Sequence, residues 1–332
     1  MRFRIVVFLV LIIPLLPLAC GKSPSAPTPA PVQTPIALPP PANTVISGRL
    51  VDTITSQPIA GATIDLLSIQ ASSGSDGAFR YELPPGTVNA QAMVKVTAPF
   101  LLERTLYLSI PGSREVEINS VSLAGGFDLA FYRKFVRDDN DSPGVLRSLR
   151  RWTQAPKIYV RTINEQGAPI EAATVNPVVA ALQDDAAAWT GGRFGLAGVE
   201  LGTESREGQS GWITVKWAAP LTDLSNCGRA QIAVNGGWIE FNYLQKSGCD
   251  CRGSRIGTKT VRHELGHAMG FYHTGDSRDL MFGTAICEDR HATARERLHA
   301  AIAYGRAIGN ADPDVDPTAA VQAFTPPIVI VD

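Results

Sequence analysis

The residues best suited to chemistry lie close together in one short stretch that contains His263, Glu264, His267, Gly270 and His273. On a helix, residues four apart lie one turn apart on the same face, so His263 and His267 could bind one metal ion. Glu264 lies about 100° round the helix from His263, beside such an ion. From there its carboxylate could take a proton from a metal-activated water. The stretch therefore predicts a catalytic metal site in which Glu264 is the general base.

The third histidine can join this site only if the helix stops. On a continuous helix His273 would lie about 240° round from His267 and point away from the metal. Gly270 lies between them and can end the helix, because glycine adopts the left-handed conformation without steric cost. We therefore predict that one catalytic Zn2+ binds His263, His267 and His273, with its fourth position open to water. Three of the chain's five histidines lie in this stretch.

The spacing H-E-x-x-H-x-x-G-x-x-H resembles the signature of the metzincin zinc peptidases. That family places a methionine-containing turn beneath the metal, and the resemblance assigns this role to Met281. Residues 152–308 look most like a matrixin catalytic domain, with 229–234 and 237–242 similar to its fourth and fifth strands. The resemblance implies a zinc endopeptidase that hydrolyses peptide bonds of extracytoplasmic proteins. A substrate would add as a strand beside residues 229–234.

The chain departs from some members of that family just after Met281. Two positions further on it has Gly283, where astacins and serralysins carry a tyrosine. Glycine has no side chain to offer, so we expect the three histidines and water alone to coordinate the metal. Tyr272 directly precedes His273, so we expect its side chain to point away from the ion, and we expect no other tyrosine, such as Tyr304, to reach it.

The elements that must position the site follow from local patterns. Alternating or apolar runs predict strands at 157–163, 195–201, 212–217, 229–234 and 238–242. Helical spacing predicts helices at 178–189, from near Thr258, and at 292–308. We expect the last helix to bury a face made of Ala294, Leu298, Ala301 and Ile302. This order indicates an α+β catalytic domain at 152–309. We expect 124–151 to be a linker and 310–332 an irregular tail.

An all-β sandwich is predicted before this domain, at 45–123. Short alternating runs are separated by turn signals, and we predict strands at 45–52, 61–67, 78–83, 93–98, 106–110 and 115–123. Phrases at 46–52, 58–64 and 76–79 resemble the transthyretin-like or carboxypeptidase-regulatory domain. That resemblance implies an accessory sandwich, and we find no active-site constellation in it. The fold class is therefore an N-terminal β-sandwich followed by an α+β zinc peptidase domain of the metzincin type.

The first residues predict export. Arg2 and Arg4 precede a short apolar run, and 16–20 resembles a bacterial lipobox that ends in Cys20, although Pro17 departs from it. We predict a signal peptide at 1–20, lipidation of Cys20 and a Pro-rich disordered tether at 21–44. The protein would then be extracytoplasmic and anchored to a bacterial membrane through the lipid. The alternative is secretion with an incidental cysteine.

The remaining cysteines agree with an oxidising compartment. Cys227, Cys249, Cys251 and Cys287 are even in number and confined to one region, which predicts disulfides. Three connectivities are open, and a Cys249–Cys251 bridge is the least favoured because it would be strained. We expect Cys227 and Cys287 each to bridge to Cys249 or Cys251. A second zinc ion held by these cysteines is the alternative.

Composition and charge limit the partners. The 332-residue chain is 45% hydrophobic and 18% charged, with a net charge of −1. Such a balance offers no basic field for nucleic acid and otherwise says little about partners. The metzincin resemblance implies protein or peptide substrates, and we expect a monomer. A different class of function is a surface-binding lipoprotein whose peptidase domain is inactive or secondary. The intact Glu264 argues against it, since an inactive site needs no general base. A metal-dependent hydrolase of non-protein amides is a third possibility.

Overall fold

The computed structural model of the chain describes residues 41–141, 146–218, 227–242, 256–284, 289–318 and 327–331. These residues belong to one compact unit that spans 41–332. The signal peptide, nearly all of the tether and four of the five cysteines (Cys20, Cys249, Cys251 and Cys287) lie outside the described residues. Within the described parts, no helix has the length and apolar character needed to cross a membrane.

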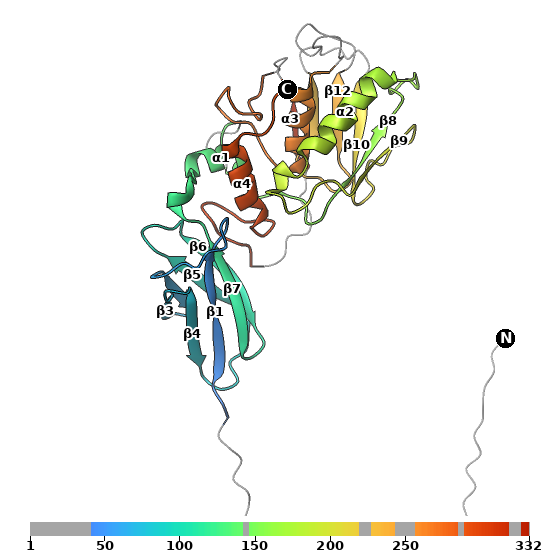
Figure 1. Ribbon diagram of the computed structural model, residues 1–332. Helices are drawn as coiled ribbons and strands as arrows, with labels where there is room; N and C mark the ends of the chain where they lie inside the picture. Colours follow the sequence, from blue (N-terminus) through green and yellow to red (C-terminus); the bar gives the residue numbers. More distant parts are fainter. Residues whose placement is uncertain are drawn as a thin grey trace, which may run out of the picture. The chain divides into compact units, whose positions relative to one another are not determined.

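Residues 44–120 form a β-sandwich of two sheets (Figure 1). One sheet has the order β4-β1-β7 and the other β3-β2-β5-β6. The strands are β1 (Thr44–Asp52), β2 (Thr63–Leu66), β3 (Ile69–Ser72), β4 (Ala78–Leu83), β5 (Asn89–Thr97), β6 (Arg104–Ile110) and β7 (Arg114–Ser120). Burial alternates along β4 and β5, so that one face of each sheet lines a shared apolar core. The six strands predicted here are confirmed, and β3 is the one that the sequence pattern missed.

A six-stranded sheet forms the second half of the molecule, with the order β13-β11-β12-β10-β8-β9. Its strands are β8 (Lys157–Arg161), β9 (Gly198–Gly202), β10 (Trp212–Ala218), β11 (Gly228–Gln231), β12 (Trp238–Asn242) and β13 (Val329–Val331). Strands β9, β8, β10 and β12 run parallel, whereas β11 is antiparallel to both of its neighbours. Helices α2 (Ala172–Asp185) and α3 (Thr258–Met269) lie against the sheet, and their apolar sides share its core (Figure 1).

Two segments expected to be irregular contain ordered elements. Within 124–151, the expected linker, helix α1 (Leu129–Arg137) packs into the main core, and the Phe135 ring stacks on Phe271 with centroids 4.4 Å apart. Within 310–332, the expected tail, β13 joins the sheet, and the side chains of Asn310 and Asp314 are buried. The expectation of irregular structure was therefore wrong for the part of each segment that forms α1 or β13. The tail's ordered parts are held by contacts with distant residues rather than by local periodicity.

The helix that follows Met281 also differs from its prediction. Helix α4 covers Ala294–Tyr304, which is shorter than 292–308 at both ends. Ala294 is exposed, whereas Glu296 and His299 are fully buried. The predicted apolar face was therefore partly wrong. The Glu296 carboxylate can be buried on this helix because backbone N–H groups donate hydrogen bonds to it. Helix α2 begins at Ala172, earlier than the predicted 178, and a 3-10 turn (Ala188–Thr190) ends at Gly191 in the left-handed conformation.

Candidate metal centre

The helix that carries the first two histidines ends as the sequence predicted. Helix α3 stops at Met269, and Gly270 follows with φ of 118°, in the left-handed region. Its N–H donates to the carbonyls of Gly266 and His267, which closes the helix end. A Cβ atom at Gly270 would overlap the carbonyl oxygen of Arg150. The position therefore requires glycine both for its backbone conformation and for the close approach of another chain segment.

The chain then turns back and brings the three histidines together. The ring centroids lie 4.7 Å apart for His263 and His267, 5.3 Å for His263 and His273, and 4.9 Å for His267 and His273. The Nε2 atoms of His267 and His273 are 3.3 Å apart. One ligand atom from each ring lies within 4.8 Å of the others. His263 and His267 are buried, and the His273 side chain is 12% exposed.

The far side of each imidazole is fixed by an acceptor. His263 Nδ1 lies 2.7 Å from the Leu280 carbonyl, and His267 Nδ1 lies 2.7 Å from the Phe271 carbonyl. Both carbonyl oxygens can only accept, so each Nδ1 must carry the proton. His273 Nδ1 lies 3.1 Å from an Asp141 carboxylate oxygen. The Nε2 lone pairs are thus left to face the centre of the cluster, which is the arrangement that metal-binding histidines adopt.

The donor set fits a small tetrahedral cation. Ligands at about 2.0–2.1 Å from a tetrahedral zinc ion would lie about 3.3–3.4 Å from one another. The observed separation of the His267 and His273 Nε2 atoms is 3.3 Å, which matches this edge length. Three neutral imidazoles also suit zinc, which keeps one position open in catalytic sites. The residues present therefore fit the predicted ion.

Glu264 lies beside this cluster and is fully buried. Its side chain packs against the backbone of Gly228, the first residue of β11. A Cβ atom at Gly228 would overlap Glu264 Oε1 and lie 2.8 Å from both Cδ and Cγ. The start of β11 therefore fixes the place of the carboxylate, and only glycine leaves room for it there.

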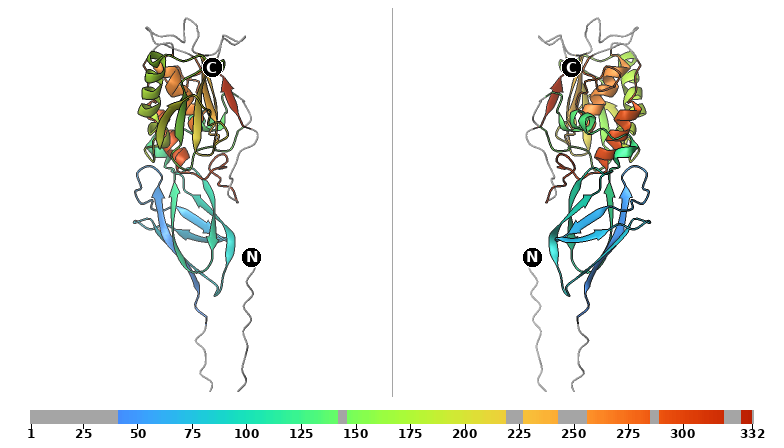
Figure 2. Two further views of the ribbon diagram at one scale, coloured as in Figure 1. Left: turned by 90° about the vertical axis from the view of Figure 1, so that its right-hand side faces the viewer. Right: turned by 90° about the vertical axis from the view of Figure 1, so that its left-hand side faces the viewer.

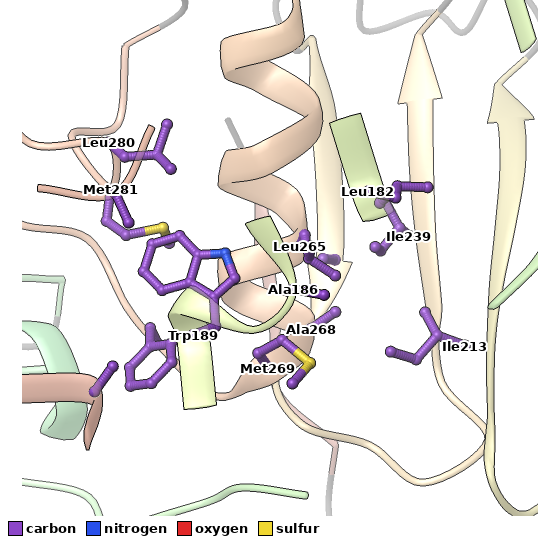
Figure 3. Close-up of a cluster of buried hydrophobic side chains, with 14 of the residues drawn as sticks. Leu182, Ala186, Trp189, Ile213, Ile239, Leu265, Ala268, Met269, Leu280 and Met281 are labelled. Carbon is purple, nitrogen blue, oxygen red and sulfur yellow. The ribbon is translucent and has the colours of Figure 1, made fainter. Parts of the chain in front are cut away.

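Met281 lies in a turn that packs against helix α3, which carries His263 and His267. Met281 is fully buried, and a Cβ atom at Gly266 would overlap its sulfur and lie 3.0 Å from Trp189. Figure 3 shows the Met281 side chain directed at the Trp189 ring beside α3. The preceding residue, Leu280, supplies the carbonyl that contacts His263. The turn thus positions one of the three rings from outside the helix.

The carboxylate of Glu296 holds this turn. It accepts hydrogen bonds from the backbone N–H groups of Leu280 (3.1 Å), Met281 (2.8 Å) and Thr293 (2.7 Å). Burial raises the pKa of Glu296, and the backbone donors only partly offset that effect. Thr293 and Glu296 also form a capping box at the start of α4. One buried side chain therefore begins a helix and fixes the turn under the histidines.

Gly283 lies against the His273 ring, which leaves little room for a side chain at this position. A Cβ atom at Gly283 would lie 3.3 Å from three atoms of the His273 ring. The hydroxyl of Tyr304, meanwhile, donates to the Met269 carbonyl at 2.8 Å. Tyr304 is therefore engaged with the end of α3 and not with the histidine cluster.

Of the four clustered cysteines, only Cys227 is described, and it is disulfide-bonded. Its partner lies outside the described residues, so the pairing stays a prediction. Cys227 directly precedes Gly228, which contacts Glu264. The bridge therefore ties down the chain at the point where β11 enters the candidate site.

A second group of possible ligands, Asp184, Asp185 and His291, lies elsewhere on the chain. His291 Nδ1 is 2.8 Å from Asp185, and Arg262 lies 3.0 Å from Asp184 and 3.5 Å from Asp185. The guanidinium of Arg262 also pairs with Asp289. Because Arg262 already supplies the positive charge, we interpret this group as an ion-pair network that joins α2 and α3.

Three residues of the site were missed from the sequence. Glu296 had a readable signal, since Thr293 and Glu296 have capping-box spacing. Asp141 and Gly228 had none, because each meets its partner through the tertiary fold. Burial opposes ionisation of Asp141, but the hydrogen bond with the His273 ring outweighs it, so the pKa of Asp141 lies below its usual value.

Comparisons with known proteins add no functional assignment. No protein-family model and no curated protein sequence matches the chain. A cohesin–X-dockerin complex from Acetivibrio cellulolyticus matches with 22% identity over 22% of this chain and 51% of its own, at a TM-score of 0.17. Hydroxyquinol 1,2-dioxygenase from Pseudomonas putida matches with 13% identity over 26% of this chain and 58% of its own, at a TM-score of 0.21. A Bacteroides fragilis protein of unknown function matches with 17% identity over 26% of this chain and 30% of its own, at a TM-score of 0.21. The chain thus spans about half the length of the first of these, and similarities this small support no conclusion about its function.

Proposed function

We propose that the chain is a zinc-dependent endopeptidase of the metzincin type, with a matrixin-like catalytic domain. One observation carries the proposal. The three histidines converge with each Nδ1 beside an acceptor and with the Nε2 atoms of His267 and His273 3.3 Å apart, and the buried Glu264 lies next to them. An ordinary set of structural histidines has no need for three fixed tautomers that face one point.

The residues divide the work of peptide hydrolysis among them. The chemistry that a bound zinc ion supplies is a lowered pKa for the attacking water and polarisation of the substrate carbonyl. Glu264 would accept the proton from that water on its carboxylate and deliver it to the leaving nitrogen. Gly228 and the start of β11 hold Glu264 in place for both transfers. Asp141, Leu280 and Phe271 would keep the three rings oriented.

The test uses the purified protein and a diverse peptide mixture, with and without a chelator. Glu264→Gln should keep the metal and lose activity by a factor of about 10²–10⁴, the usual contribution of a general base. His267→Ala should lose both metal and activity. Glu200→Gln is the matched control, because Glu200 lies on β9 with its side chain 50% exposed and should change neither.

Three results would count against the proposal. Wild-type turnover in Glu264→Gln would show that the mechanism is wrong. Stoichiometric metal with no cleavage of any peptide would instead favour a surface-binding protein with an inactive site, and cleavage of non-peptide amides would favour a different hydrolase.

We also propose that the mature chain is exported and lipid-anchored at Cys20, with the β-sandwich as an accessory domain. The support is the charged start, the apolar run and the lipobox-like residues 16–20. Mass spectrometry of the mature N-terminus should find a lipidated Cys20. An unmodified N-terminus beyond Cys20 in the soluble fraction would show secretion instead.

A further inference from the structure

Strand β11 leads directly into the candidate site. Its first residue, Gly228, contacts Glu264, and Ala230 is fully buried two residues later. Just beyond the strand, the N–H of Ala233 lies 3.4 Å from the His267 carbonyl. The segment from Gly228 to Ala233 therefore runs beside helix α3 from Glu264 to His267. A peptide paired with β11 would lie beside the histidines and the general base.

The chain's own residues 327–331 occupy that position. Strand β13 is antiparallel to β11, and it pairs Val329 with Gln231, Ile330 with Ala230 and Val331 with Arg229. The Ile232 N–H also donates to the Ile328 carbonyl at 3.0 Å. In Figure 2 this strand, drawn in red, lies along one edge of the sheet. Without it, β11 would be the edge strand of the sheet that the described residues form.

The direction of β13 matters for chemistry. From Val329 to Val331 it passes from Gln231 to Arg229, so the next position in register lies opposite Gly228. Gly228 is the residue against which Glu264 packs. A substrate paired in the same sense would bring the residues on the N-terminal side of its scissile bond towards Glu264.

Two strands cannot use the same backbone groups of β11. We propose that residues 327–331 are an intramolecular competitor, which fills the peptide-binding edge of β11 and must leave before a substrate strand can pair there. This inference rests on the proposed function for its catalytic consequence, but its core claim is about peptide binding. The competitor is rich in β-branched residues, which favour an extended strand, so the edge should take extended apolar peptides.

The hydrogen-bond pattern between β11 and β13 identifies a substitution and a matched control. Antiparallel pairs alternate between hydrogen-bonded and non-hydrogen-bonded positions. Because Ile232 bonds with Ile328, Ile330 falls at the next hydrogen-bonded position, opposite Ala230, and Val329 does not. Proline at Ile330 should remove a ladder bond, whereas proline at Val329 should remove an N–H that faces away from β11.

The experiment measures binding of a labelled synthetic peptide of residues 327–332 to the chain ended after Thr318 and to the full chain. We expect saturable binding to the shortened chain and at least about tenfold weaker binding to the full chain. That factor assumes an effective concentration of about 1 mM for the tethered segment and a dissociation constant of about 0.1 mM. The Ile330→Pro peptide should bind more weakly than the Val329→Pro peptide.

If the shortened chain fails to fold, measurements on the full chain still test the inference. In the full chain, Ile330→Pro should speed hydrogen exchange at the Ile232 amide and admit the peptide, and Val329→Pro should do neither. In an active protein, Ile330→Pro should also lower KM with kcat unchanged. The inference is overturned if the peptide binds the full and opened chains equally or binds neither, since β13 would then be a permanent structural strand. Peptide binding without any peptidase activity would overturn the proposed function alone.

Discussion

At the scale of single residues, the site depends on contacts with residues that lie outside the H-E-x-x-H-x-x-G-x-x-H motif. The motif predicts which histidines meet, because helical spacing and the break at Gly270 are local properties. It does not predict what holds the rings, because the acceptors of His263 and His273 belong to Leu280 and Asp141. Such partners come from other parts of the chain, and a sequence pattern has no information on their approach.

Asp141 gives the first test at this scale. Its carboxylate contacts His273 Nδ1 at 3.1 Å and should hold that ring in its metal-binding orientation. Removing a partner of this kind typically lowers metal affinity about 10–100-fold. We therefore expect Asp141→Ala to bind zinc that much more weakly in competition with a chromogenic chelator. Asp139→Ala, two residues away, should keep wild-type affinity, and equal affinities for the two variants would contradict the assigned role.

Gly228 gives the second test. A methyl group there would overlap Glu264 Oε1, so Gly228→Ala should displace the proposed general base without touching the histidines. We expect kcat to fall about 10²-fold, the lower end of the contribution of a general base, while the zinc content stays at the wild-type level. Gly198→Ala on β9 is the control, since no atom lies within 4 Å of its Cβ position. Loss of zinc in Gly228→Ala would show that the whole site, and not Glu264 alone, had moved.

At the scale of elements, local patterns succeeded where an element carries its own signal. Helix α3 and strand β12 formed at their predicted positions, because their spacing, apolar content and flanking glycines are local. Strand β13 did have a local signal, the β-branched run at 328–331, but its pairing with β11 depends on the tertiary fold, so no window of sequence could assign its partner. Helix α1 did have signals, since Asp128 caps it and apolar residues lie at 131, 132, 135 and 136. The prediction of a linker at 124–151 did not use them.

Glu296 provides the test at this scale, because it joins helix α4 to the turn of Met281. Glu296→Gln replaces an acceptor oxygen with an N–H2 group that cannot accept from a backbone N–H. Leaving a buried donor unsatisfied costs about 1–3 kcal/mol, so the free energy of unfolding in urea should fall by that amount. The Leu280 carbonyl would also shift, and zinc affinity should weaken with it. Glu200→Gln should leave the free energy of unfolding within about 0.5 kcal/mol of wild type.

At the scale of the whole molecule, buried charges join the sandwich strands to the segment after α4. Asp314 lies 2.9 Å from Arg104 of β6 and 2.8 Å from Arg306. Arg306 also donates to Asn119 of β7 at 2.6 Å. The three charged side chains are 6% exposed or less. The sequence did not predict the ion pair between Arg104 and Asp314, because the two residues lie more than two hundred positions apart in the chain. The segment treated as an irregular tail is therefore part of the structural framework.

This cluster predicts an acid-sensitive stability. Burial alone would raise the pKa of Asp314, but Arg306 and Arg104 outweigh it, so the pKa in the folded state lies below the usual 3.8. A carboxylate with a depressed folded pKa stabilises the fold above its unfolded pKa, and the contribution is lost as the pH falls through the folded pKa. Stability measured by urea unfolding should therefore decrease as the pH is lowered from about 4.

Asp314→Asn tests that account at neutral pH and in acid. It leaves the buried Arg306 guanidinium without a carboxylate and leaves Arg104 with Asp316 alone, so the free energy of unfolding at neutral pH should fall by about 3–5 kcal/mol. Its stability should also depend less on pH below about 4 than that of the wild type, because the titrating group is gone. Glu82→Gln breaks an ion pair with Arg80 whose side chains are 58% and 57% exposed, so it should cost less than about 1 kcal/mol. If Asp314→Asn and the wild type lost stability in parallel below pH 4, other carboxylates would have to carry the acid sensitivity, and the ion-pair cluster would be a consequence of the packing rather than a support for it.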